Sequence, residues 1–393
     1  KITIIVSWLN HVGWVENRMK KGIGIIGFAD GIGTIIAVIF WFYMASVLVP
    51  EQYGNMFYFL GITGIISYFT IVGGQNAITV YAAKNLNIQG TFYFLSLVLG
   101  LIAILFIVVI FNRVDVALVL LGYIVSNLAI SYLLGKKLHQ TYLKYALTQK
   151  ILLITLGIGF FYVFGFDGIL YAIGLSYLFY GIIICKSFKN SRIDFSLFKS
   201  RMGFIMNDYF MGIVNVARSQ TDKLIIAPLL GFALLGNYSL ALQVVMALTI
   251  FPNVLFKYLL PEEVERKSNK KLKGASIIIS ISIAILGLTL TPSILPEIFP
   301  KYADSVEAIQ IMSLAVIPIT VNMIYTSQLL GLEKSKFVLI GRLVALVTII
   351  IATITLGTFY ELIGLALAFL LTSILQAIVS TYANYRLKIS HEY

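Results

Sequence analysis

VNVARSQTDKLIIAPLLG (214–231) places three charged residues, Arg218, Asp222 and Lys223, directly before an apolar run. The stretch lies within 204–230, a segment long enough to cross a bilayer as one helix. A charged side chain that faces lipid at the bilayer centre costs about 3 kcal/mol or more. We therefore expect these charges to face protein or a wet cleft.

The composition of the whole chain indicates a membrane protein. Of its 393 residues, 59% are hydrophobic and 12% are charged, and this charged share is about half that of a soluble domain. The charges cluster between apolar runs of roughly 20 residues, each able to span a bilayer as a helix. We predict an all-α polytopic membrane protein with about 12 transmembrane helices, at 23–48, 55–81, 91–111, 116–134, 150–165, 168–185, 204–230, 237–260, 275–295, 305–330, 337–357 and 362–385.

The basic residues predict the orientation of these spans. Of the 29 lysines and arginines, 25 fall at or near the tails and the connections from even-numbered to odd-numbered spans. Arg113 and Lys301 fall in the opposite loops, and Arg218 and Lys223 fall inside a span. Because Lys and Arg favour cytoplasmic loops, we predict cytoplasmic N and C termini in the cell (inner) membrane. The net charge of +12 then reflects topology, and we expect no nucleic-acid partner.

The spans divide into two halves. We predict an N-terminal extension (1–22), a first lobe (23–185), a cytoplasmic linker (186–203), a second lobe (204–385) and a cytoplasmic tail (386–393). In the linker, aromatic and aliphatic residues alternate with Lys and Arg, as in a segment that lies on an anionic membrane surface. Gly54-Asn55 and Gly236-Asn237 lie 182 residues apart, and Gly168 and Gly364 lie 196 apart. These offsets predict a six-plus-six parallel repeat.

A polar stripe follows the seventh span. Asp208, Asn215 and Asp222 are spaced seven residues apart, and Gly212, Arg218 and Ser219 fall on the same third of the helix. Arg218 and Asp222 are four residues apart and are predicted to pair. In one interpretation this pair only fastens the helix to its neighbours. In the other, the first and seventh spans line a cleft in which Asn215, Arg218, Ser219 and Lys223 bind an anionic head group.

The acidic residues suggest ion coupling. Asp30 lies about two turns inside the first span, and Asp208 and Asp222 lie in the seventh. In the cleft interpretation they exchange H⁺ or Na⁺. One cysteine, Cys185, and three separated histidines exclude a cysteine-cluster metal site and argue against a zinc centre. The longest outward loop, 296–304, has nine residues and leaves no room for a polymerase site. We expect no metal, no cofactor and no enzyme activity.

Several short motifs resemble those of polysaccharide exporters. LVPEQYGNMFYF (48–59) is similar to their "L-G-P-E-x-Y-G" turn. DKLIIAPLLG (222–231) followed by GNYSLA (236–241) is similar to their "D-x-x-x-I-x-x-x-x-G … G-x-Y-S-x-A" signature. Pro261, LLGLEKSKF (329–337) and the run from Gly364 add to the likeness. The chain thus resembles, from about 20 to 388, the Wzx-like branch of the multidrug/oligosaccharidyl-lipid/polysaccharide (MOP) exporter superfamily.

The resemblance implies a fold and a function. The fold would be a V-shaped, MATE-like bundle of two six-helix lobes that alternates access. The function would be translocation of polyprenyl-(pyro)phosphate-linked oligosaccharide for polysaccharide or O-antigen biosynthesis, with membrane lipids and polysaccharide assembly enzymes as partners. Two alternatives remain open, a MATE-type drug/cation antiporter and a peptidoglycan lipid flippase.

Overall fold

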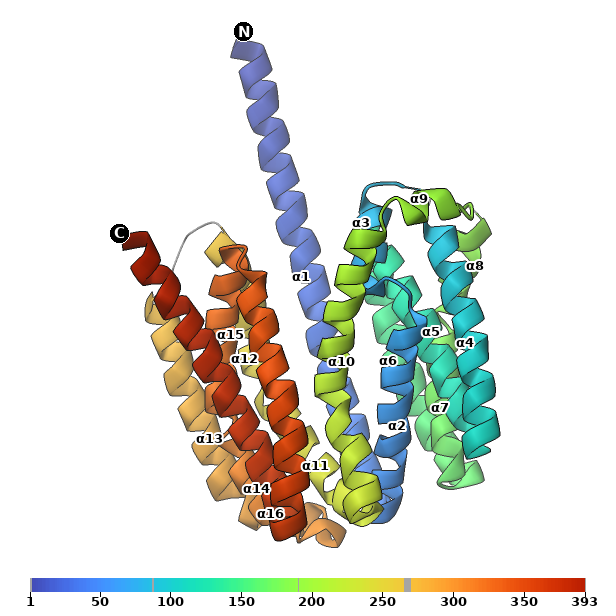
Figure 1. Cartoon of the computed structure of the whole chain (residues 1–393), viewed down its shortest axis with the longest axis vertical. Helices are drawn as coiled ribbons and strands as arrows, with labels where there is room; N and C mark the ends of the chain where they lie inside the picture. The colour runs from blue at the N-terminus through green and yellow to red at the C-terminus, as the bar shows by residue number, and fades with distance from the viewer. Residues whose placement is uncertain (1, 87, 190, 265–269, 393) are drawn as a thin grey trace.

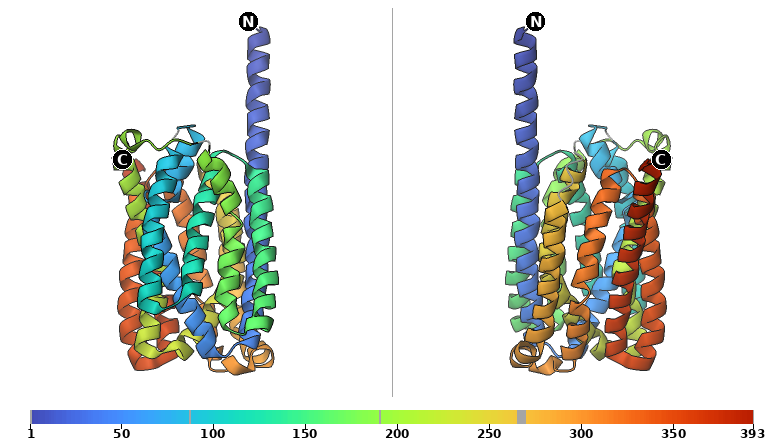
Figure 2. Two further views of the ribbon diagram at one scale, coloured as in Figure 1. Left: turned by 90° about the vertical axis from the view of Figure 1, so that its right-hand side faces the viewer. Right: turned by 90° about the vertical axis from the view of Figure 1, so that its left-hand side faces the viewer.

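The chain folds almost entirely into helices. A computed structural model describes residues 2–86, 88–189, 191–264 and 270–392, and within these ranges it contains no β-strand (Figures 1 and 2). The helices are α1 (Ile2–Val47), α2 (Pro50–Thr70), α3 (Gly74–Ala83), α4 (Gln89–Phe111), α5 (Val114–Gly135), α6 (His139–Phe164), α7 (Asp167–Leu178), α8 (Gly181–Lys189), α9 (Phe195–Lys199), α10 (Met202–Leu230), α11 (Phe232–Leu248), α12 (Ile250–Val264), α13 (Lys270–Ile298), η1 (Pro300–Tyr302), α14 (Ser305–Ser313), α15 (Val316–Gly331) and α16 (Ser335–Glu392).

Most of these helices can cross a membrane. Eight helices of the described chain are long and apolar enough, or up to ten if each of two bent helix pairs is one span. Leu101, Leu105 and Val109 of α4 are more than half exposed, as lipid-facing side chains are. The prediction of a nearly all-helical, multi-span membrane protein is confirmed, whereas the count of twelve stays a prediction.

Two helices explain the difference in the count. α10 has 29 residues, but it contains several charged and polar side chains. It is therefore not among the helices that are apolar enough to be recognised as spans. α16 has 58 residues and contains a non-helical residue, Glu361, with φ 47° and ψ −124°. The chain turns back there, so that two arms of α16 run side by side in Figure 1. A Cβ added at Gly364 would lie 1.8 Å from the Leu356 carbonyl oxygen across this turn.

The two halves of the chain repeat the same local geometry. α2 and α3 form a pair bent by 47°, and α11 and α12 form a pair bent by 48°. A Cβ added at Gly168 would lie 2.5 Å from the Phe160 carbonyl oxygen, eight residues earlier. A Cβ added at Gly364 would likewise meet the carbonyl oxygen of Leu356, which is also eight residues earlier. These equivalent positions support the predicted repeat.

The halves, α1–α8 and α10–α16, meet at the end of the bundle away from both termini, which we call the far end (Figure 1). A Cβ added at Gly54 would lie 1.9 Å from the Phe232 carbonyl oxygen, and one added at Gly236 would lie 1.8 Å from that of Pro50. Lys301 Nζ donates to the Val47 carbonyl oxygen at 2.9 Å. The far end is therefore closed by direct backbone contact between α2 and α11.

The linker between the halves is fastened to the first half. The Asp194 backbone N–H donates to Thr91 Oγ1 at 2.8 Å, and the Phe198 ring packs on Phe92 with centroids 5.3 Å apart. Ile193 and Phe195 are 46% and 52% exposed. The segment thus has a buried and an exposed apolar side.

Candidate functional site

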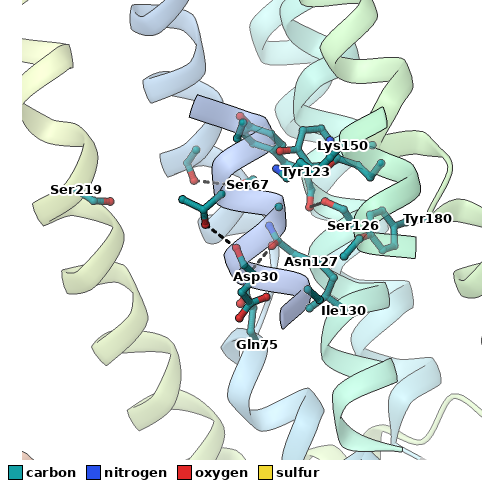
Figure 3. A pocket seen from close by; sticks show the side chains of 18 of the residues that line it. Asp30, Ser67, Gln75, Tyr123, Ser126, Asn127, Ile130, Lys150, Tyr180 and Ser219 are labelled. Carbon is teal, nitrogen blue, oxygen red and sulfur yellow. Dashed lines mark hydrogen bonds between the residues drawn. The ribbon is translucent and has the colours of Figure 1, made fainter. Parts of the chain in front are cut away.

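A cavity of about 640 Å³ lies between the first half and helices α10 and α11 (Figure 3). Its walls come from α1, α2, α3, α5, α6 and α7, and its remaining side from α10 and α11. On α1 the lining runs from Ala29 to Trp41, a length of about 18 Å along a helix. Lipid-spanning helices therefore enclose a polar chamber.

Asp30 lies at one end of this cavity on α1. Its carboxylate Oδ1 accepts a short hydrogen bond from the Tyr142 hydroxyl of α6. Its carbonyl oxygen accepts a hydrogen bond from Thr34 Oγ1 at 2.7 Å. The cavity thus has a carboxylate held in place by a phenol, which suits the exchange of a proton or a small cation.

Amide and aromatic side chains form most of the remaining lining. Gln75 Nε2 donates to Asn127 Oδ1 at 2.7 Å, and Gln149 Nε2 donates to Ser176 Oγ at 3.2 Å. Gln243 Oε1 is buried and has no hydrogen-bond partner among the described residues. An unpaired buried acceptor is costly unless a ligand or water satisfies it. The rings at the wall belong to Trp41, Tyr68, Tyr123, Tyr142, Tyr177 and Tyr180.

Lys150 adds a positive charge to this cavity. It lines the wall from α6, and a Cβ built at Gly33 would lie 3.7 Å from its Cε. Among the described residues it has no carboxylate within 4.0 Å. The sequence prediction placed Lys150 at the edge of a span that begins at 150. The helix begins at His139 instead, so Lys150 falls in its interior.

Ser219 is the predicted site residue that joins Asp30 in the cavity. In Figure 3 it lies on α10, across the cavity from the labelled residues of the first half. Its hydroxyl donates to the Val216 carbonyl oxygen at 3.0 Å. Asn215 is exposed and is not part of the cavity wall.

Asp208 contacts the first half at a different place. Its Oδ1 accepts from Asn76 Nδ2 at 2.9 Å and its Oδ2 accepts from the Ala77 backbone N–H at 3.0 Å. Both donors lie in the first turn of α3, which starts after the bend at Gly73. A carboxylate at a helix N-terminus satisfies unpaired N–H groups. This cap was not predicted, because the segment that contains the bend was predicted as one continuous helix.

The predicted pair between Arg218 and Asp222 is not formed. Arg218 Nη1 donates to Gln376 Oε1 of α16 at 3.2 Å, whereas Asp222 Oδ2 accepts from the Tyr238 hydroxyl of α11 at 3.0 Å. Asp222 Oδ1 also accepts from the Lys223 backbone N–H at 2.8 Å. The correction has a simple cause, since each side chain finds a partner on a different neighbouring helix.

Lys223 does not act beside Arg218 either. Its Nζ donates to Gln220 Oε1 at 2.6 Å and lies 6.0 Å from the centre of the Phe57 ring on α2. The five residue steps from Arg218 to Lys223 turn the helix by about 140°. The structure therefore directs Arg218 toward the second half and Lys223 toward the first.

The described residues contain no group of three or more His, Cys, Asp or Glu side chains that could hold a metal ion. The site chemistry is that of charged, amide, hydroxyl and aromatic side chains.

No known protein family and no curated protein sequence matches the chain. Solved structures do match. One is "Inward-facing conformation of a multidrug resistance MATE family transporter of the MOP superfamily", with TM-score 0.70 and 15% identity over 92% of this chain and 95% of that one. Another is "Lipid II flippase MurJ, inward closed conformation", with TM-score 0.71 and 14% identity over 91% and 86%. A third is "Crystal structure of MATE in complex with MaL6", with TM-score 0.65 and 15% identity over 95% and 96%.

These matches cover nearly the whole length of both chains at low sequence identity, so they show a shared fold. The names of the matched proteins are those of transporters and of a flippase. The chain has the fold of the MATE transporters and of the MurJ flippase.

Proposed function

We propose that the chain is a flippase that moves polyprenyl-(pyro)phosphate-linked oligosaccharide, a Wzx-like substrate, across the cytoplasmic membrane by alternating access. The observation that carries the proposal is the cavity between the halves. It combines aromatic rings and amides with Lys150, which has no ion-pair partner among the described residues. Aromatic faces and amide groups suit sugar rings and hydroxyls, and a lysine suits an anionic substrate.

The proposal includes an orientation. Both termini and α9 lie at one end of the bundle (Figure 1), where the connections rich in Lys and Arg also lie, and we assign this end to the cytoplasm. Of the two basic residues in the far-end loops, Arg113 is neutralised by Asp115 at 2.6 Å. With each bent pair and α10 counted as one span and α16 as two, the described part of the chain has twelve spans. The closed far end then corresponds to an inward-facing state, and the exposed side of the linker lies against membrane lipids.

We assign ion coupling to Asp30. It lies in the cavity with Tyr142 as its hydrogen-bond donor, and H⁺ or Na⁺ bound there would change the charge that the cavity presents to the substrate. Asp208 and Asp222 remain weaker proposals for coupling, because neither lines the cavity. Ser219 and Asn215 are proposed to contact the substrate on α10, and Lys223 to contribute positive charge beside α2.

One observation favours a second function, that of a MATE-type drug/cation antiporter. Asp30 among aromatic rings would also suit an organic cation. Lys150 in the same cavity opposes this interpretation, because it would repel such a ligand. The likeness to a lipid II flippase keeps a peptidoglycan lipid as an alternative substrate. Polysaccharide assembly enzymes would supply or consume either lipid-linked substrate.

Proteoliposomes can test the proposal. A polyprenyl diphosphate saccharide with a fluorophore on its sugar is incorporated in both leaflets, and dithionite added outside quenches the outer leaflet. A flippase raises the quenched fraction from about half toward all of the label, while protein-free vesicles stay at half. Lys150→Gln should slow this exchange, and the matched change Lys186→Gln on the exposed side of α8 should not. Uptake of a fluorescent cation without exchange of the lipid would favour the antiporter instead.

A further inference from the structure

A groove of about 640 Å³ runs along the second half, between α15 and the second arm of α16, which follows the break at Glu361. α15 lines it with residues between 317 and 321. On α16, Ile378 and Tyr382 are 56% and 57% exposed, whereas Ala377 is 6% exposed. The groove thus has a wall of large apolar and aromatic side chains and a narrow floor of small ones.

The groove faces away from the cavity of the candidate site. Gln376, on the same arm of α16, accepts a hydrogen bond from Arg218 at 3.2 Å, so this side of the arm faces α10. Ile378 is two residues from Gln376 and points about 160° away from it around the helix. Behind the groove, Ser380 Oγ donates to Asn322 Oδ1 of α15 at 2.6 Å. The groove therefore opens to lipid, on a surface separate from the cavity.

The groove matches the length of one lipid chain. From Ile374 to Tyr385, its two ends on α16, the helix rises about 16 Å. Half of the hydrocarbon core of a bilayer is about 15 Å thick. Glu361, at the far end, lies about 20 Å from Ile374 along the helix. The groove therefore lies in the leaflet next to the termini, which is the cytoplasmic leaflet in the proposed orientation.

A positive charge lies at the end of this groove. Arg386 directly follows Tyr385, and its guanidinium carbon lies 5.6 Å from the centre of the Tyr382 ring. Arg386 is exposed, and no carboxylate lies within 4.0 Å of it among the side chains that the structure describes. Tyrosine and arginine side chains at the end of a span reach the depth of the lipid head groups. An apolar groove that ends at an arginine is complementary to a lipid with an anionic head.

We propose that the groove binds one anionic phospholipid of the cytoplasmic leaflet, with an acyl chain along α16 and its phosphate on Arg386. The inference goes beyond the proposed function and uses it only for the orientation. Any lipid can cover an apolar surface, so the distinguishing property of the site is a preference for the anionic head. A guanidinium group binds a phosphate through charge-assisted hydrogen bonds. One arginine near the membrane surface favours an anionic lipid about fivefold.

Quenching of a tryptophan in the groove tests the proposal. Tyr382→Trp places the reporter beside Arg386, and its emission is measured as the difference from the parent protein. The full chain is reconstituted in mixtures of phosphatidylglycerol and phosphatidylcholine, of which one carries bromine on its acyl chains. The reporter should prefer phosphatidylglycerol about fivefold, and Arg386→Gln should remove this preference. Arg192→Gln, which changes an exposed arginine of the linker, is the matched control and should keep it.

A second variant tests whether the groove itself is needed. Thr381 lines the groove, and Thr381→Phe should fill part of it while Arg386 stays intact. If the acyl chain must lie in the groove, this change should also remove the preference for phosphatidylglycerol. Thr358→Phe, at an exposed position on the first arm of α16, should leave the preference unchanged.

Four results would overturn the proposal. Equal quenching by both phospholipids would indicate ordinary boundary lipid. A preference that survives Arg386→Gln would exclude the arginine, and one that survives Thr381→Phe would exclude the groove. Stronger quenching by a brominated polyprenyl phosphate than by phosphatidylglycerol would assign the groove to the tail of a transported lipid. The proposed function is tested separately, because absence of lipid exchange in proteoliposomes would contradict the flippase and leave this site in place.

Discussion

Replacing Gly54 by alanine should shift the chain away from the state described here. Gly54 on α2 faces α11 at the far end, and an added Cβ would lie 1.9 Å from the Phe232 carbonyl oxygen and 2.7 Å from the Gly236 nitrogen. An ordinary carbon–oxygen contact is about 3.3 Å. To accommodate the methyl group, the two backbones, which now touch, must move apart by about 1.4 Å.

The size of the shift follows from this overlap. Overpacking of a well-packed contact costs about 1–3 kcal/mol, and about 1.4 kcal/mol corresponds to a tenfold change in an equilibrium constant. The cost applies to the state in which the far end is closed and is relieved when it opens. Gly54→Ala should therefore raise the ratio of far-end-open to far-end-closed molecules by about 5-fold to 150-fold.

Thiol labelling measures this ratio. The one cysteine, Cys185, is exposed and is first replaced by serine, after which Ser219→Cys provides a reporter in the cavity. A membrane-impermeant maleimide is applied to vesicles in which the far end of the protein faces outward and to vesicles in which the termini face outward. With Gly54→Ala, labelling from the far-end side should be about tenfold faster or more, and labelling from the side of the termini should be slower.

Gly159→Ala on α6 is the control, because a Cβ there meets no atom within 4 Å. The rate of maleimide labelling in this variant should equal that of the parent protein. Equal labelling of Gly54→Ala and the parent, at equal amounts of folded protein, would refute the view that the α2–α11 contact is the closure of the far end.

Three further predictions follow from other parts of the molecule. A reporter fused after Lys199 should lie in the cytoplasm, and a reporter fused after Ala303 should lie outside the membrane. The reverse result would contradict the proposed orientation. Asp30→Asn should remove the dependence of lipid exchange on an H⁺ or Na⁺ gradient while binding of the lipid persists, and an unchanged gradient dependence would exclude Asp30 from coupling. The linker should lose order in acid. Hydrogen bonds from the Leu197 backbone N–H and from Ser196 lower the pKa of Asp194, so its cap on α9 is intact at neutral pH and is lost only as pH falls below the usual aspartate range of about 3.9. Hydrogen exchange at Leu197 should be slow at pH 7 in the parent and fast in Asp194→Ala, and equally slow exchange in both would show that the cap does not hold α9.

Much of the fold could be predicted from the sequence, because hydropathy reports directly on what lies in lipid. The predicted spans 91–111 and 116–134 lie within two residues of α4 and α5. The start of α6 was missed because polar residues precede Lys150, and of these Gln149 is buried and lines the cavity whereas Gln140 and Lys144 are exposed. A hydropathy pattern cannot distinguish a polar helix turn outside the bilayer from one that faces a polar interior.

The site was predictable only in part. The polar stripe on α10 predicted a helix that does not face lipid alone, and Ser219 on this stripe lines the cavity. A helical projection assigns residues to one face, but α10 touches α2, α11 and α16 at once.

α10 also limits how the two halves could be exchanged between related proteins. It is bonded to the first half through Asp208 and Asn76 and to the second through Arg218 and Gln376. A chimera joined before Met202 would separate the first pair, and one joined at Gly231 would separate the second. Of the crossover points between Asn76 and Gln376, those between Asp208 and Arg218 keep each pair within one parent. Recombination between the halves should therefore succeed at a junction inside α10 and need compensating changes at a junction on either end of it.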